Sequence, residues 1–208
     1  MTHRDTSRRR KNRTPRPAPP PLDSAKLQEL ALAYVARFAT TSAKLEAYLS
    51  RKLRERGWNR DDDGGGENLP DLGEISARFV DLGYIDEDAY ARSRSRGLLG
   101  RGFGPRRVSQ DLYAAGIDEQ TRSEIAPGQA AIRRAAFELA RKRRFGPFSA
   151  QEPDPERNRS RKQKQVAAML RAGHGFETVK AIMGAASVAA AEEWVAEAQD
   201  AEAQDEEI

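Results

Sequence analysis

Apolar residues recur along most of the chain at the spacing of one helical face. The first such stripe consists of Leu27, Leu30, Ala31, Tyr34, Val35 and Phe38. Its members are separated mostly by three or four residues, as the 3.6-residue period of an α-helix requires. No segment shows the strict alternation of apolar and polar residues that is typical of a half-buried strand. The pattern therefore predicts an all-α protein.

Capping residues divide the stripes into successive helices. Asp71, Asp86 and Asp118 precede apolar stripes, where a side-chain oxygen can accept hydrogen bonds from the first free backbone N–H groups. Gly57 and Gly116 follow two of the stripes, and glycine commonly ends a helix at this place. These signals predict helices that are mostly short and joined by tight turns.

One helix-and-turn pattern occurs twice, and less regularly a third time. Leu49, Leu53, Gly57 and Trp58 correspond at one constant offset to Val108, Leu112, Gly116 and Ile117. In the third copy, Gly173 and Gly175 compete for the end of the helix. The pattern predicts three tandem three-helix repeats, which stack into an elongated, curved array. Chance similarity among amphipathic helices is the alternative.

The same signals predict the organisation of the chain. Residues 1–21 are rich in Arg and Pro without apolar periodicity, which predicts a disordered basic tail. The repeats are expected at 22–85, 86–127 and 128–184. Residues 185–208 contain eight acids and no Lys or Arg, and we expect an acidic C-terminal helix there.

Composition excludes several kinds of site. The chain has no Cys and 2 His, so cysteine-based zinc sites and thiolate nucleophiles are excluded, and no metal site, cofactor or catalytic residue is expected. No apolar run approaches the roughly 20 residues that cross a bilayer. The basic N-terminus continues into prolines rather than the apolar core of a secretory signal. We therefore expect a cytoplasmic protein that is not an enzyme and has no membrane partner.

Basic residues form two clusters, which favour a polyanionic partner. No acid interrupts the first, from residue 92 to 107, and the second covers residues 141–144 and 157–164. Solvated helix faces are the alternative interpretation. The candidate residues for contact with DNA or a protein partner are Arg92, Arg96, Arg101, Arg106, Arg107, Arg141, Arg144, Arg161 and Lys164.

Within the first cluster, Arg92 and Arg96 are one helical turn apart and would share a patch facing the partner. Arg94 would point elsewhere and is left unassigned. Aromatic residues are sparse here, so contact with a phosphate backbone is a better expectation than base stacking. Core positions are expected for the three nearest aromatic residues, which are Tyr90, Phe103 and Tyr113.

Arg106 and Arg107 follow Pro105, which suits the first position of a helix. Backbone N–H groups and the positive end of the helix dipole favour anions at this position. A phosphate or carboxylate of a partner is therefore expected beside these two arginines. Ion pairs with Asp111 or Asp88 are the alternative.

Two segments carry a resemblance to a known family. Residues 82–93 read Leu-Gly-Tyr-Ile-Asp-Glu-Asp-Ala-Tyr-Ala-Arg-Ser, and residues 102–108 read Gly-Phe-Gly-Pro-Arg-Arg-Val. In this order they resemble the RecX regulatory proteins, which are bacterial modulators of the RecA recombinase. The similarity covers about residues 25–184 and departs from the family in the loops at 59–70 and 146–158 and in the turn from Gly173 to Phe176.

The resemblance implies three tandem three-helix repeats that lodge in the groove of a RecA filament on single-stranded DNA. It also implies inhibition of ATP hydrolysis, strand exchange and coprotease activity, and hence regulation of homologous recombination and of the SOS response. The family brings no catalytic residues. We expect a monomer. A sequence-independent nucleic-acid-binding protein without a recombinase partner is the alternative.

Overall fold

The computed structural model describes residues 20–59 and 69–206, which are helical apart from turns and one isolated bridge between Leu22 and Trp58. The expected basic tail therefore lies almost entirely outside the described residues, and so does most of the loop at 59–70. The helices are α1 (Ser24–Val35), α2 (Ser42–Arg56), α3 (Leu72–Asp81), α4 (Glu87–Gly100), α5 (Pro105–Ala114), α6 (Glu119–Glu124), α7 (Gln129–Arg143), the 3-10 turn η1 (Gly146–Phe148), α8 (Pro155–Arg171), α9 (Phe176–Gly184) and α10 (Val188–Glu206).

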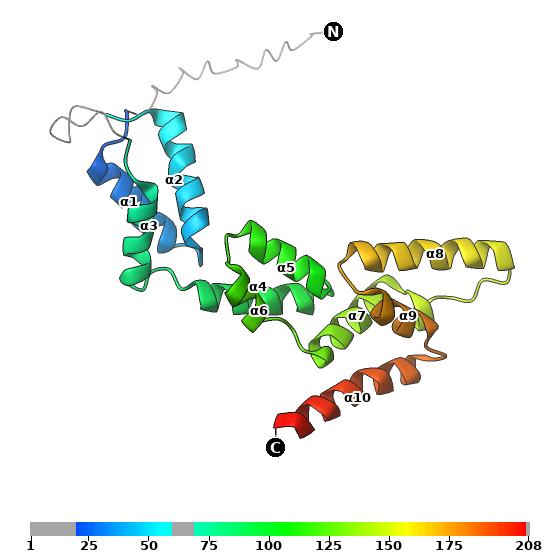
Figure 1. Cartoon of the computed structure of the whole chain (residues 1–208). Helices are drawn as coiled ribbons and strands as arrows, with labels where there is room; N and C mark the ends of the chain where they lie inside the picture. The colour runs from blue at the N-terminus through cyan, green and yellow to red at the C-terminus, as the bar shows by residue number, and fades with distance from the viewer. Residues whose placement is uncertain (1–19, 60–68, 207–208) are drawn as a thin grey trace, which may run out of the picture.

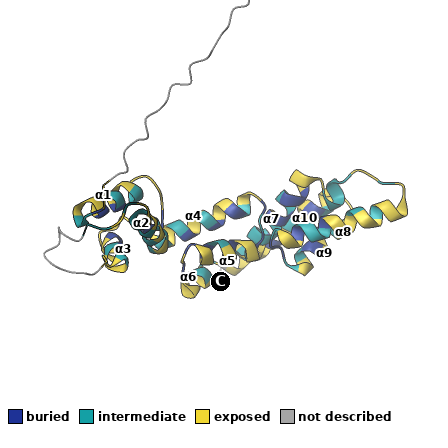
Figure 2. Cartoon of the chain, turned by 90° about the horizontal axis from the view of Figure 1, so that it is seen from above, coloured by how far each residue is buried: buried dark blue, intermediate teal, exposed yellow. Residues whose placement is uncertain are grey.

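Three groups of three helices follow one another along an elongated, bent body (Figure 1). We call them unit 1 (α1–α3), unit 2 (α4–α6) and unit 3 (α7–α9). Figure 2, turned by 90°, shows the same succession, with buried residues gathered inside each unit. The prediction of an all-α array of three tandem three-helix repeats is confirmed.

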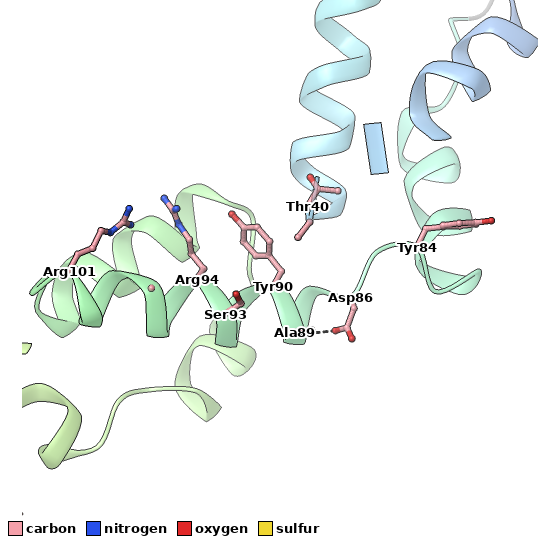
Figure 3. A pocket seen from close by; sticks show the side chains of 10 residues that line it. Thr40, Tyr84, Asp86, Ala89, Tyr90, Ser93, Arg94 and Arg101 are labelled. Carbon is pink, nitrogen blue, oxygen red and sulfur yellow. Dashed lines mark hydrogen bonds between the residues drawn. The ribbon is translucent and has the colours of Figure 1, made fainter. Parts of the chain in front are cut away.

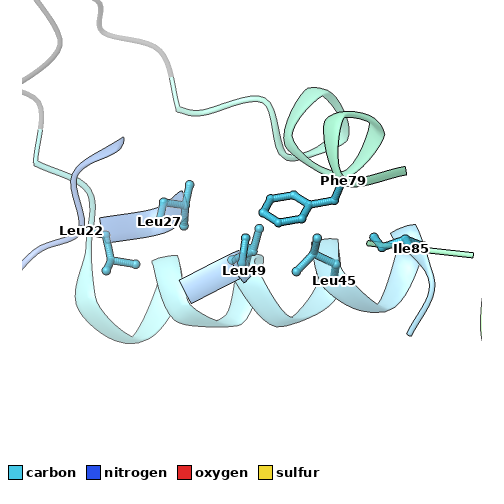
Figure 4. Packing of buried hydrophobic residues seen from close by; sticks show 7 residues of the cluster. Leu22, Leu27, Leu45, Leu49, Phe79 and Ile85 are labelled. Carbon is cyan, nitrogen blue, oxygen red and sulfur yellow. The ribbon is translucent and has the colours of Figure 1, made fainter. Parts of the chain in front are cut away.

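Each unit has its own apolar core. In unit 1, Leu27 of α1 and Leu45 and Leu49 of α2 are fully buried and pack with Phe79 of α3 (Figure 4). In unit 2, Ala91 and Leu98 of α4 pack with Val108 and Leu112 of α5, and in unit 3, Ala136 and Met169 pack with Ile182. A single small core stabilises few residues, so stacking against neighbours is needed for stability.

The predicted helix ends are largely observed. The side chains of Asp71, Asp86 and Asp118 accept hydrogen bonds from the first N–H groups of α3, α4 and α6. Gly57, Gly116 and Gly173 end the second helix of their units with φ values of 80°, 84° and 95°, a left-handed conformation that glycine adopts at no steric cost. Gly173 is therefore the stop in the third copy, and Gly175 is the N-cap of α9.

The acidic C-terminal helix α10 is observed, and it packs on unit 3. Ala191 and Ala198 are buried, and Trp194 packs against the core of α7 and α9. The Glu202 carboxylate accepts a hydrogen bond from the backbone N–H of Ala130 at 2.9 Å, at the start of α7. The acids of α10 thus stabilise the positive end of the α7 dipole.

Units 1 and 2 are joined at the start of α2 and the end of α5. The hydroxyl of Thr41 donates to the carbonyl oxygen of Ala115 at 2.6 Å, and the N–H of Ser42 donates to the Glu87 carboxylate at 2.8 Å. A Cβ at Gly116 would lie 2.3 Å from the Cβ of Ala43. Glycine is therefore required here for close approach as well as for its backbone conformation.

Units 2 and 3 are joined by the corresponding elements, which here are the start of α5 and the end of α8. The N–H of Gly104 donates to Ala172 at 2.9 Å, and the N–H of Arg106 donates to Gly173 at 3.2 Å. The contacts that join neighbouring units are therefore repeated along the chain, as the helices are. In both junctions, the start of a unit's second helix meets the end of the second helix in the following unit.

His174 is fully buried at the second junction. Its Nε2 lies 3.0 Å from the carbonyl oxygen of Gly102, and because a carbonyl only accepts, Nε2 carries the proton and donates. Nδ1 is buried and has no hydrogen-bond partner among the described residues. Burial lowers the pKa of His174 below its ordinary value, although the hydrogen bond to Gly102 opposes this shift.

We predict that this histidine makes stability depend on pH between 7.5 and 5.5. The unfolded chain binds a proton near pH 6.5, whereas the folded chain resists it to a lower pH, so the free energy of unfolding is highest above pH 6.5. It falls as pH decreases below that value, by at most about 1.4 kcal/mol per pH unit. Urea titrations of the wild type and of His174→Gln at both pH values measure the effect. A wild type with the same pH dependence as the variant would contradict it.

Candidate nucleic-acid interface

A cavity of about 590 Å³ lies where units 1 and 2 meet. One side of α4 forms its wall, through Tyr90, Ser93, Arg94, Gly97 and Arg101. Figure 3 shows Arg94 and Arg101 rising from the same side of this helix, with the Tyr90 ring between them and Thr40. The small residues along α4 leave room beside the arginines.

Most of the charged side chains in and beside this cavity have partners within the chain, and its one acid, Asp86, caps α4. Arg94 donates twice to Asp111, from Nε at 2.6 Å and from Nη2 at 2.9 Å. These hydrogen bonds lower the pKa of Asp111, so its carboxylate stays ionised and neutralises Arg94. Lys44 donates to the Tyr90 hydroxyl, and its Nζ lies 4.6 Å from the centre of that ring. Arg101 has no ion pair within the part of the chain that the structure describes, so it is the cation available to a ligand here.

A second cavity, of about 330 Å³, lies between units 2 and 3. Arg101 also lines this cavity, so one side chain borders both. Lys142 and Arg143 of α7 and Arg171 of α8 complete a set of four cations, and none of the lining residues is acidic. Lys142 is held in place, since its Nζ donates to the carbonyl oxygen of Gly100 at 3.0 Å. We call the two cavities together the basic groove.

The predicted pair of Arg92 and Arg96 lies outside the basic groove. Each residue of a helix is turned by about 100° from the one before. Arg92 and Arg96 therefore lie on one flank of α4, and Arg94 and Arg101 lie on the other flank. Arg92 pairs with Asp88 at 2.9 Å. The patch that we expected around Arg92 and Arg96 is thus separate from the cations between the units.

The expected anion site at the start of α5 is only partly available. The N–H of Arg106 already donates to Gly173, and that of Arg107 donates to Gly104. The prediction that free backbone donors attract an anion is therefore wrong for these two groups. Both arginine side chains are exposed. The alternative pairing with Asp111 or Asp88 is not observed either, since Arg94 and Arg92 occupy these carboxylates.

The candidates in the second cluster do not line the basic groove. Arg141 pairs with Glu138 at 2.9 Å, Arg144 ends α7 with a φ of 54°, and Arg161 donates to Asn158 at 3.1 Å. Lys164 is exposed on α8. Of the nine candidates, the structure therefore places Arg101 in the groove and the other eight outside it.

Sequence reasoning missed the groove residues Lys142, Arg143 and Arg171. The first two belong to the basic run of residues 141–144, but the run does not reveal which side faces unit 2. The aromatic expectations were correct in part. Tyr90 and Phe103 are half-buried, whereas Tyr113 is 70% exposed, and the guanidinium carbon of Arg122 lies 5.2 Å from its ring centre. The prediction of a core position for Tyr113 is therefore wrong.

Neither a metal centre nor a membrane helix is found in residues 20–59 and 69–206. No three carboxylate or histidine side chains there are grouped so that they could hold a metal ion. None of the helices described there is both long and apolar enough to cross a bilayer.

Known proteins resemble this chain in sequence and in fold. Residues 86–124, which include all of α4 and α5, match the family described as RecX, second three-helix domain. The regulatory protein RecX of Myxococcus xanthus is 30% identical over 164 residues, which cover 76% of this chain and 83% of that protein. The regulatory protein RecX of Agrobacterium fabrum is 31% identical over 144 residues, covering 69% and 73%.

The fold is also that of a solved relative. The crystal structure of RecX from Lactobacillus salivarius aligns with a TM-score of 0.55 at 21% sequence identity, covering 77% of this chain and 94% of that chain. The similarity to the two bacterial regulators extends over most of the described helices and most of each relative. With its three stacked units and its sequence, the chain belongs to the RecX family of regulatory proteins.

Proposed function

We propose that this protein binds the filament that RecA recombinase forms on single-stranded DNA. Bound there, it restrains ATP hydrolysis, strand exchange and coprotease activity, and so regulates recombination and the SOS response. Membership of the RecX family carries the proposal. The protein acts by binding in the cytoplasm, as a monomer without a cofactor, and the units are residues 22–85, 86–127 and 128–184, with α10 added to the third.

The basic groove supports this proposal with a surface suited to phosphates. Arg101, Lys142, Arg143 and Arg171 gather from α7, α8 and the turn after α4, and no acid lines the cavity between units 2 and 3 that they share. Such a group of cations attracts a nucleic-acid backbone without reading its sequence. The exposed arginines outside the groove, Arg92, Arg96, Arg106 and Arg107 among them, are proposed as contacts to other parts of the same filament.

The elongated shape supports the same partner. Units that contact only their neighbours form an extended surface, which can lie along a polymer rather than enclose a small ligand. Arg101 lines both of the cavities where neighbouring units meet. One molecule can therefore contact several successive positions of a filament.

The proposal is tested by ATP hydrolysis. We expect the full-length protein, at about one molecule per recombinase, to decrease hydrolysis by the recombinase of the same organism on single-stranded DNA. An unchanged rate would contradict the proposed function. Binding to fluorescent single-stranded DNA is measured in parallel, with and without the recombinase. Equal affinity for naked DNA and for the filament would favour the alternative, a nucleic-acid-binding protein without a recombinase partner.

A further inference from the structure

A second cleft lies in unit 1, between α1 and α3. Both helices pack on α2, and a cavity of about 710 Å³ separates them. Apolar side chains line it, of which Ile75 and Phe79 also pack against the core. Leu32, Leu82 and Tyr84 line it as well and are 46%, 59% and 54% exposed. Apolar side chains that line a cleft and stay exposed are typical of a surface that binds another protein.

The charge at this cleft is opposite to that of the basic groove. Glu29, Asp71 and Glu74 line it, against one basic residue, Arg78. Asp71 caps α3, and Glu29 contacts Lys26. The carboxylates would repel a nucleic-acid backbone and attract a basic segment of a protein.

Unit 3 shows how an additional helix packs on a unit of this fold. Helix α10 contains seven acids and no base, and it packs on α7, which is rich in arginine. Arg133 of α7 donates to the carbonyl oxygen of Trp194 at 2.6 Å and lies 3.4 Å from the Glu197 carboxylate. The small residues Ala191 and Ala198 lie on the buried face of α10. A unit of this fold therefore accepts a fourth helix that is apolar on one face and opposite in charge.

We propose that the cleft between α1 and α3 binds a cationic amphipathic helix of a partner protein. Its apolar face would cover Leu32, Leu82 and Tyr84, and its lysines or arginines would lie beside Glu29 and Glu74. This is the usual arrangement when an amphipathic helix fills a groove between helices.

The basic N-terminal segment of this chain fits the cleft less well than a separate helix does. Residues 1–19 carry the required charge, but they contain no Leu, Ile, Val or Phe and several prolines. They therefore offer no apolar face of the size that the exposed side chains of the cleft require. The inference does not depend on the proposed function, because the cleft and the basic groove have only Tyr84 in common.

The probe is a fluorescein-labelled amphipathic peptide of Leu and Lys, about 15 residues long, a length at which isolated helices begin to be stable. The control peptide has Glu in place of every Lys. Fluorescence polarisation with the full-length protein is expected to show saturable binding of the Lys peptide, at least about tenfold tighter than that of the Glu peptide.

Two substitutions in the cleft and one outside it locate the site. Leu82→Lys combined with Glu74→Lys is expected to weaken binding of the Lys peptide at least about tenfold, since both place a cation against a cation. Both residues are exposed, so the fold should tolerate them, and circular dichroism checks this. Leu170→Lys is the matched control, because Leu170 is also an exposed leucine, at 38%, but lies on α8. It should leave binding unchanged.

Three results would overturn the proposal. The first is equal binding of the Lys and Glu peptides, and the second is wild-type affinity of the doubly substituted cleft. The third is binding that occurs only when Arg8, Arg9 and Arg10 are replaced by Ser in the full chain, because the chain's own basic segment would then be the occupant.

Discussion

Replacing Gly104 by Ala is expected to destabilise the junction between units 2 and 3 by about 2–3 kcal/mol. The added Cβ would lie 2.4 Å from the backbone of Gly173 and from the backbone nitrogen of His174. A backbone cannot turn aside as a flexible side chain can, so the two helix ends must separate. The hydrogen bond from Gly104 to Ala172 would lengthen with them.

Thermal unfolding measures this effect. In a chain of this size, each kcal/mol corresponds to roughly 2–4 °C, so the midpoint should fall by about 5–10 °C. Gly100→Ala is the matched control, because Gly100 lies at the end of α4 and a Cβ there meets nothing within 4 Å. It should be neutral or slightly stabilising. Equal midpoints for the two variants would show that the junction tolerates a side chain.

Reversing two charges of the basic groove is expected to weaken binding to single-stranded DNA and to the filament about a hundredfold. The variant is Arg101→Glu with Arg143→Glu, and each lost contact between an arginine and a phosphate is worth about 1.5 kcal/mol or more. Both residues are exposed and without an ion pair among the described residues. The helical content should therefore stay the same.

The control reverses two charges on the other flank of the same helix. Arg92→Glu with Arg96→Glu changes the net charge equally, and should weaken binding to naked DNA much less. The salt dependence separates the two cases further. Four contacts give a slope of about −3 for log K against log salt on single strands, and the groove variant should lose roughly half of it. Equal losses in the two variants would show that overall charge, not the groove, determines binding.

Much of the fold follows from local signals in the sequence. Asp86 and Asp118 cap helices, and Gly57 and Gly116 end them, because capping depends on a few neighbouring residues. The apolar stripes indicated the helices because they too depend only on residues that are close in sequence. The glycine that ends α8 could not be predicted from the sequence, because only the packing of the α8–α9 turn on α5 distinguishes Gly173 from Gly175.

The candidate site was harder to predict because it depends on which flank of a helix faces the next unit. The spacing of Arg92 and Arg96 correctly places them together on α4, yet the groove lies on the flank of Arg94 and Arg101. Asp111, seventeen residues beyond Arg94, determines that Arg94 is neutralised. Such partners come from other helices, and a pattern within one helix does not contain them.

Segments of the chain outside the three units pack on unit 1 and on unit 3. Leu22 forms two backbone hydrogen bonds with the turn after α2, to Gly57 at 2.9 Å and from Asn59 at 2.7 Å, at the end of α2 that corresponds to the end of α5 joined to unit 1. At the other end α10 covers α7, much as α7 packs on α4. A further helical unit could therefore stack at either of these places only if the segment around Leu22 or helix α10 first moved aside.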